Sequence, residues 1–260
     1  MLKRDAKKRE EDKMELKGKI ALVTGGSMGI GTAISLDLAQ NGADVALTYR
    51  KHGDEAKAIV EKIKNMGRKA KEYQVDVSDF GLAQKLVKGV MDDFGGLDIL
   101  INNAGMNWDG VVWKMTEEQW DAVINVDLKG TFNFIRAVAP HFKEQKSGKI
   151  VNITSINGLR GKFGQANYSA AKAGAHGLTK AVAREMGKFG VNVNAVAPGM
   201  ILTDMYKDLP EEFKTKAADE TVFNRLGEPE DVAHLVAFLV SERARHITGE
   251  IIKIDGGQYI

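Results

Sequence analysis

The residues that decide the fold run from Ile20 to Gly31 and read Ile-Ala-Leu-Val-Thr-Gly-Gly-Ser-Met-Gly-Ile-Gly. The first four form a short apolar run with β-branched members, which is typical of a buried parallel strand. Residues 33–39 read Ala-Ile-Ser-Leu-Asp-Leu-Ala, a pattern that predicts a helix. A glycine-rich turn between a strand and a helix is the setting in which glycines indicate a nucleotide site.

The glycines of this turn predict a site for a pyrophosphate. Glycine has no Cβ, so the turn can be tight and an anion can approach the backbone closely. The helix that follows supplies unpaired N–H groups and a favourable dipole for that anion. The spacing from Gly25 to Gly31 is Gly-x-x-x-Gly-x-Gly, which differs from the Gly-x-Gly-x-x-Gly of the general dinucleotide fingerprint.

The same alternation of strand and helix continues along the chain. We expect further strands at 45–49, 71–75, 97–101, 149–154, 191–196 and 251–254, and helices at 54–66, 79–94, 117–133, from about 168 onward, and at 229–241. Such alternation predicts an α/β fold with helices on both faces of a parallel sheet. Right-handed crossovers then give a single doubly wound Rossmann domain of seven strands, spanning 17–260, with ligands at the carboxyl ends of the strands.

The composition limits the classes of protein to which the chain can belong. The chain has 260 residues, 43% hydrophobic and 28% charged, which is ordinary for one soluble globular domain. Its net charge of +2 favours neither a nucleic-acid partner nor a membrane partner. The sequence has no cysteine, which excludes disulfides, thiolate catalysis and thiolate-bound zinc, and its five histidines show no metal-ligand spacing. We therefore expect no metal, and a cytoplasmic location.

Two segments fall outside the regular pattern. Residues 1–13 hold six basic and four acidic side chains and almost nothing apolar, which is unlike a signal peptide, so 1–16 is predicted to be a charged, disordered tail. Residues 204–226 are polar and irregular with one possible short helix. A long segment of this kind at the ligand edge predicts a lid.

The end of the second strand bears on the choice of dinucleotide. A site that prefers NAD places Asp or Glu there, to accept from the ribose 2′-hydroxyl. In this chain Tyr49 is followed by Arg50 and Lys51. An arginine can neutralise a 2′-phosphate, so the sequence favours NADP(H) over NAD(H). The alternative is that these two charges lie on an exposed turn without a ligand.

Tyr168 and Lys172 are candidates for acid–base chemistry. A spacing of four on a helix places both side chains on one face, and an ammonium beside a phenol lowers the pKa of the phenol. Ser155 lies thirteen residues upstream of Tyr168, at the end of a strand-like run. Its hydroxyl can hydrogen-bond an oxygen that also faces Tyr168. By itself Tyr-x-x-x-Lys is also common on solvated helix faces.

Two further helical features call for an explanation. Asn125 lies within Ile124-Asn-Val-Asp127, and asparagine has a poor helix propensity. Its apolar neighbours argue against simple solvation. The helix that begins near Tyr168 is rich in alanine and glycine, which suggests a close subunit interface or, alternatively, close packing on its own sheet.

Taken together, these residues resemble the short-chain dehydrogenase/reductase family from about residue 17 to the C-terminus. The resemblance is carried by Thr24-Gly-x-x-x-Gly-x-Gly31, Asn102-Asn-Ala-Gly105, Asn125, Ser155, Tyr168-x-x-x-Lys172 and Pro198-Gly199, in the family's order and spacing. It implies an NADP-dependent oxidoreductase acting on CH–OH or C=O groups, with Asn125, Ser155, Tyr168 and Lys172 as catalytic residues. It further implies cofactor-binding roles for Gly25, Ser27, Met28, Gly29, Ile30, Gly31, Tyr49, Arg50, Asp76, Val77, Asn103, Ala104, Gly105, Tyr168, Lys172, Pro198, Gly199, Ile201 and Thr203.

Within the family, two stretches, 103–109 and 164–174, are similar to 3-oxoacyl-(acyl-carrier-protein) reductases, and 155–164 is equally similar to acetoacetyl-CoA reductases. The resemblance implies reduction of a 3-oxoacyl thioester with NADPH in a homotetramer. It also implies that Lys146 and Lys188 meet an acidic acyl carrier protein, with its arm threaded to the nearby active site. Two alternatives stay open: a dehydrogenase of a free sugar, polyol or cyclic alcohol, and an NADPH-binding sensor without turnover.

Overall fold

The structure is a computed structural model that describes residues 14–203 and 210–260. Within these residues one sheet holds seven parallel strands in the order β3-β2-β1-β4-β5-β6-β7. The strands are β1 (Ile20–Val23), β2 (Asp44–Tyr49), β3 (Ala70–Gln74), β4 (Ile99–Asn102), β5 (Gly148–Ile153), β6 (Val191–Pro198) and β7 (Ile251–Ile254). The strand order reverses between β1 and β4, which creates the crevice where such sheets bind ligands. The predicted doubly wound fold is confirmed.

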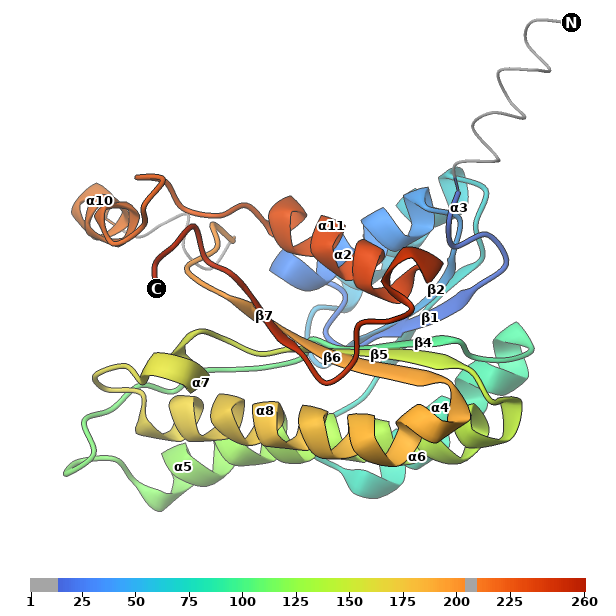
Figure 1. Ribbon diagram of the computed structural model, residues 1–260, viewed down its shortest axis with the longest axis horizontal. Coiled ribbons are helices and arrows are strands. Elements are labelled where there is room, and N and C mark those ends of the chain that lie inside the picture. Colours follow the sequence, from blue (N-terminus) through green and yellow to red (C-terminus); the bar gives the residue numbers. More distant parts are fainter. Residues whose placement is uncertain (1–13, 204–209) are drawn as a thin grey trace, which may run out of the picture.

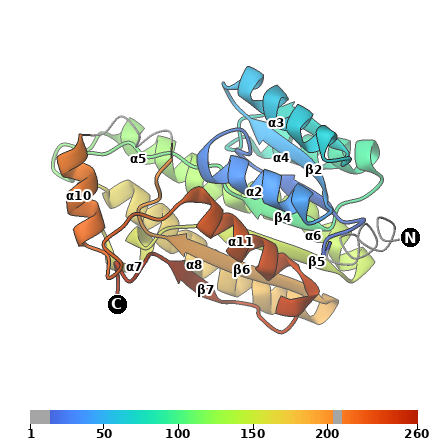
Figure 2. The same cartoon turned by 90° about the horizontal axis from the view of Figure 1, so that it is seen from above.

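Helices cover both faces of this sheet (Figure 1). One face carries α2 (Gly29–Gln40), α3 (Gly53–Asn65) and α11 (Pro229–Val240), and the other carries α4 (Phe80–Phe94), α6 (Gly130–Gln145) and α8 (Ala166–Met186). Each layer has its own hydrophobic cluster against the sheet. The view from above shows α2 and α11 side by side over the middle of the sheet (Figure 2).

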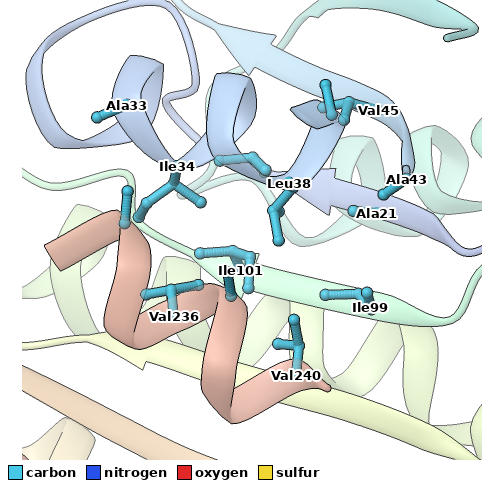
Figure 3. Close-up of a cluster of buried hydrophobic side chains, with 14 of the residues drawn as sticks. Ala21, Ala33, Ile34, Leu38, Ala43, Val45, Ile99, Ile101, Val236 and Val240 are labelled. Atoms are coloured by element: carbon cyan, nitrogen blue, oxygen red, sulfur yellow. The ribbon is translucent and has the colours of Figure 1, made fainter. Parts of the chain in front are cut away.

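The cluster beneath α2 and α11 fixes the helix that follows the glycine-rich turn. Figure 3 shows Ile34 and Leu38 of α2 meeting Val236 and Val240 of α11 around Ile101 of β4. All five side chains are buried. Burying an aliphatic side chain of this size contributes about 1.5–3 kcal/mol. The N-terminus of α2 is therefore held at the carboxyl edge of the sheet by packing.

The helix expected at 117–133 is divided and longer than predicted. It consists of α5 (Glu117–Val123), a π-helical turn η1 (Ile124–Lys129), and α6, which continues to Gln145. Thr116 begins α5 with a capping box, in which its hydroxyl accepts from the Gln119 N–H and the Gln119 side chain accepts from the Thr116 N–H. The wider π turn changes which side chains of this segment face the sheet.

The shorter elements lie at the ends of the long ones. They are α7 (Asn157–Arg160), η2 (Gly187–Phe189), α10 (Glu211–Asp219) and η3 (Glu242–Ala244). The predicted lid includes α10, while its residues 204–209 lie outside the described part of the chain. Glu220, just after α10, pairs with Arg160 at 3.4 Å, and Val222 donates to the Gly256 carbonyl at 2.9 Å. The described part of this segment therefore contacts α7 and the C-terminal residues.

The boundary of the predicted tail needs a correction. Residues 1–13 lie outside the described chain, but Leu16 is buried at 2% exposure in the cluster with α2. Its N–H donates to the Asn41 carbonyl at 2.9 Å. Residues 14–16 therefore belong to the domain rather than to a tail. Across residues 14–203 and 210–260, no helix combines the length and the apolar character that crossing a membrane requires.

Candidate active site

A cavity of about 590 Å³ opens at the carboxyl edge of the sheet. It is lined by residues that follow all seven strands, from β1 to β7, which is where a doubly wound sheet places its ligand. Every site residue predicted from the sequence borders this cavity except Asn125. The structure thus brings together segments more than a hundred residues apart, while their individual roles stay predictions.

The glycine-rich turn is too tight for side chains. A Cβ on Gly31 would lie 2.1 Å from the Gly25 carbonyl oxygen, and Gly25 has a φ of +63°, in the left-handed region. Met28 precedes α2 without capping it through a side chain. The first N–H groups of α2 therefore face the cavity, which fits an anion such as a pyrophosphate.

Hydrogen bonds from the loop after β4 hold the turn in place. The Thr24 hydroxyl accepts from the N–H groups of Asn103 and Ala104 at 2.9 and 3.0 Å. The Asn103 amide donates to the carbonyls of Thr24 and Gly25, each at 3.0 Å. These four bonds tie the loops after β1 and β4 into one rigid wall. That arrangement explains why the two motifs occur together.

The end of β2 contributes basic side chains to the cavity, and the end of β3 contributes a carboxylate. Arg50, Lys51 and His52 follow β2, are exposed, and border the cavity. Opposite them, hydrogen bonds from Ser78 to Asp76 lower the pKa of that carboxyl, and the charges of Arg50 and Lys129 add to the effect. No described residue at the end of β2 offers the carboxylate that an NAD site uses there.

Tyr168, Lys172 and Ser155 meet at the opposite side of the cavity. Lys172 Nζ lies 5.4 Å from the centroid of the Tyr168 ring and donates to the Ile153 carbonyl at 3.1 Å. Burial raises the pKa of Tyr168 above its usual value; Lys172 and a hydrogen bond with Ser155 oppose this, while Asp127 and Asp109 add to it. Lys172 thus lowers the pKa of Tyr168 as expected, but the burial of the phenol outweighs this contribution.

The assignment of Asn125 is also corrected. Asp127, two residues later, is buried at 1% exposure, borders the cavity, and lies 3.0 Å from Lys172 Nζ through Oδ2. Residues two apart on a helix do not face the same side. Asp127 faces Lys172, whereas Asn125 is not among the residues that border the cavity. The polar residue of this helical segment that lies beside Lys172 is an aspartate.

Sequence reasoning also missed three polar side chains in the cavity wall. Gln165 donates to both carboxylate oxygens of Asp109 at 3.1 Å, and Gln258 accepts from the Met200 N–H at 3.1 Å. Arg160 donates to the Gln258 carbonyl at 3.4 Å. They join loops that are distant in sequence, and no local pattern marks them. Asp127, in contrast, had the same signal as Asn125, a polar residue between apolar ones.

His176 is expected to make the fold sensitive to acid. Burial lowers its pKa from 6.5 to about 4, helped by the charges of Lys172 and Lys180, and its Nε2 lies 2.9 Å from the Thr154 hydroxyl. The unfolded chain therefore takes up this proton first, so stability falls as the pH drops from about 6.5 to about 4. At about 1.4 kcal/mol per unit, the loss reaches roughly 3 kcal/mol.

Urea unfolding of the wild type and of His176→Gln across this pH range measures the effect. The variant should lose less stability than the wild type between these two pH values, since glutamine takes up no proton. His246→Gln, at a residue near the surface, is the control. If the free energy of unfolding changes with pH equally in the wild type and in His176→Gln, His176 takes up its proton equally in the folded and unfolded states.

The fold and the site together define a short-chain dehydrogenase/reductase, and the chain belongs to that family. A family model described as enoyl-(acyl carrier protein) reductase matches residues 25–258. The chain is an oxidoreductase by this membership.

Relatives that cover almost the whole chain are named as reductases of 3-oxoacyl-(acyl-carrier-protein) or of acetoacetyl-CoA. It is 46% identical to the 3-oxoacyl-(acyl-carrier-protein) reductase FabG of Staphylococcus epidermidis, over 93% of this chain and 99% of that protein. It is 41% identical to the FabG of Thermotoga maritima, over 95% and 100% of the two chains. It is 44% identical to the acetoacetyl-CoA reductase of Shinella zoogloeoides, over 93% and 98%.

Proposed function

We propose that this chain reduces a 3-oxoacyl thioester to the 3-hydroxyacyl thioester with NADPH. The observation that carries the proposal is the placement of Ser155, Tyr168 and Lys172 on one wall of a cavity whose opposite wall is suited to a dinucleotide phosphate. Relatives named for 3-oxoacyl-(acyl-carrier-protein) and acetoacetyl-CoA reduction, 41–46% identical, support the thioester as the substrate.

The residues present fit NADPH. The turn from Gly25 to Gly31, where a Cβ would fill the cradle, would hold the pyrophosphate. Arg50 would pair with the 2′-phosphate, and Asp76 and Val77 would border the adenine. Asn103 to Gly105 would line the cofactor, Lys172 would hold the nicotinamide ribose, and Ile201 and Thr203 would bind the carboxamide end. When bound, the reduced nicotinamide supplies the hydride.

The residues of the chain then carry the proton and stabilise the charge. Ser155 and Tyr168 orient the carbonyl oxygen of the substrate by hydrogen bonds, and these strengthen as negative charge develops on that oxygen. Tyr168 gives its phenolic proton to the oxygen, and Lys172 stabilises the phenolate that remains. Because Tyr168 is largely buried among protein atoms, these interactions act in a medium of low dielectric constant.

Spectroscopic oxidation of NADPH tests the substrate class. Acetoacetyl-CoA should be turned over efficiently, whereas a panel of free sugars, polyols and cyclic ketones should react slowly. Efficient reaction with a member of the panel and none with acetoacetyl-CoA would replace the proposal by the free-alcohol dehydrogenase. Binding of NADPH without oxidation of any substrate would favour the sensor.

The placement of Lys146 and Lys188 corrects the route expected for a carrier protein. Lys146 directly precedes the start of β5, and Lys188 lies in η2 before the start of β6. Both are therefore at the amino edge of the sheet, whereas Ser155 follows the end of β5. A six-residue strand spans roughly 20 Å, and α8 runs this whole length (Figure 1). A carrier at these lysines would have to serve the cavity of a second copy in a homotetramer.

The double variant Lys146→Glu, Lys188→Glu tests the carrier contact. Exposed charges mainly raise the association rate, so KM for an acyl-carrier-protein substrate should rise several-fold and its salt dependence should weaken. KM for acetoacetyl-CoA should stay unchanged, because the cavity of the chain is at the other edge. The control is Lys85→Glu, Lys88→Glu, on α4. No change with either substrate would remove these lysines from carrier recognition.

A further inference from the structure

Asp127 and Lys172 form a buried ion pair at the centre of the cavity wall. Asp127 is 1% exposed and Lys172 is 4% exposed, and the distance from Oδ2 to Nζ is 3.0 Å. The other carboxylate oxygen, Oδ1, accepts from the Met106 N–H at 2.8 Å. On its far side Lys172 donates to the Ile153 carbonyl at 3.1 Å. The ammonium is thus held between η1 and the end of β5.

Two glycines lie close to this pair, where a larger residue would not fit. A Cβ on Gly105 would lie 2.9 Å from Asp127 Oδ2 and 3.3 Å from Lys172 Nζ. Two residues after Lys172 on α8, a Cβ on Gly174 would lie 2.8 Å from Leu128 of η1, so the helix and the π turn approach closely. Two glycines therefore allow the contact between the carboxylate and the ammonium. Isolated π turns of this kind often occur at functional sites.

The charges that face Tyr168 come from three elements. Lys172 lies on its own helix, Asp127 on η1, and Asp109 on the loop after β4, where Gln165 holds the carboxylate. His176, also on α8, is neutral above its pKa of about 4. Burial lowers the pKa of Lys172, but the negative charge of Asp127 and its hydrogen bond act against this, and the pKa is raised overall. The ammonium next to Tyr168 is thus offset by a carboxylate.

We propose that Asp127 is a positioning residue for Lys172, whose carboxylate fixes the ammonium and offsets its charge, so that Tyr168 stays a neutral proton donor into alkaline pH. The reaction direction rests on the proposed function, but the effect on Tyr168 does not. A phenol is the form that gives a proton to a ketone, and a phenolate is the form that takes one from an alcohol. Asp127 therefore sets the upper pH limit of reduction.

Asp127→Asn is the direct test, because asparagine is nearly isosteric and its Oδ1 can still accept from Met106. Removing the negative charge favours the phenolate of Tyr168, so its ionisation should move to lower pH. An ultraviolet difference titration of tyrosinate without cofactor or substrate measures this directly. The titration is repeated after Tyr168→Phe is introduced into the wild type and into Asp127→Asn. Subtracting each of these curves from the curve of the protein that keeps Tyr168 isolates the signal of Tyr168.

A second readout is the pH profile of kcat/KM for NADPH oxidation with acetoacetyl-CoA. The alkaline fall in rate should begin at lower pH in Asp127→Asn. Asp121→Asn is the matched control, since it makes the same chemical change on an exposed turn of α5. Its titration and its pH profile should match those of the wild type.

The outcomes separate this inference from the proposed function. If the pH at which Tyr168 ionises is the same in Asp127→Asn as in the wild type, Asp127 does not have the proposed role. The same holds if Asp121→Asn moves this pH by an equal amount. Lack of activity with any thioester would overturn the proposed function and leave the tyrosinate titration valid. If Asp127→Asn does not fold, as judged by circular dichroism, Asp127→Ser removes the same charge with a smaller polar side chain, and the same outcomes apply.

Discussion

Tyr168→Phe is expected to lower turnover by about 10²–10⁴-fold, the usual contribution of general acid–base catalysis. The substitution removes the phenolic proton and leaves the ring, which packs next to Lys172 with Nζ 5.4 Å from its centroid. The residues proposed to hold the cofactor lie in the loops after β1 to β4 and, beyond them, at Lys172, Ile201 and Thr203, and their contacts do not need this hydroxyl. Binding of NADPH, followed by fluorescence, should therefore stay close to that of the wild type.

The control is a variant that loses the hydroxyl of a tyrosine outside the cavity. Tyr73 lies on β3 and donates to Asp93 at 2.6 Å, away from the cavity. Tyr73→Phe should keep normal turnover. If Tyr168→Phe instead keeps about a third of the wild-type rate, Tyr168 is not the proton donor. Loss of NADPH binding together with turnover would point to a structural role.

The parts of the site that could be predicted from the sequence are those encoded locally. The turn from Gly25 to Gly31 follows its strand directly, and only glycine fits where a Cβ would collide with the Gly25 carbonyl. Tyr168 and Lys172 share a regular helix, so their spacing alone places them on one face. The parallel sheet then brings these segments to one edge, because the carboxyl ends of its strands coincide there.

The predictions that failed depend on tertiary structure. Asn125 and Asp127 are equally polar in sequence, and the π turn η1, together with close packing at Gly105 and Gly174, decides that Asp127 faces Lys172. The effect of Lys172 on the pKa of Tyr168 has the predicted direction, whereas burial, which raises this pKa, has no signal in a Tyr-x-x-x-Lys spacing. Leu16 was assigned to the tail because it follows a run of charged residues, and its contact with α2 has no signal in the local sequence.

The error at Lys146 and Lys188 has a different origin, since the topology already contained the answer. A residue that precedes a parallel strand lies at the amino edge, and Ser155, which follows β5, lies at the opposite edge. Gly190 shows that the two loops adjoin, because its Cβ would lie 2.8 Å from the Lys146 carbonyl. The two lysines are therefore close to each other, but they are not close to the cavity of the same chain.

Arg50→Asp is expected to shift the preference of the chain from NADPH toward NADH. Arg50 is exposed at the end of β2 and borders the cavity, and its neighbours there are also basic. A hydrogen bond between charged groups is worth about 1.5–3 kcal/mol, which corresponds to roughly 10–100-fold in affinity. The new carboxylate would repel a 2′-phosphate and accept from a 2′-hydroxyl. The ratio of kcat/KM for NADPH to that for NADH should fall by at least this factor.

Steady-state kinetics with both cofactors measure this ratio, and the matched control is Arg136→Asp, which reverses the same charge on the exposed side of α6. Because that residue is not among those that border the cavity, its ratio should stay at the wild-type value. A lower ratio in both variants would indicate a general effect of net charge rather than a contact with the phosphate. A wild type that already prefers NADH would contradict the reading of the β2 end. Arg50 would then be an exposed turn residue, and the dinucleotide would have to be recognised without the carboxylate that usually selects NAD.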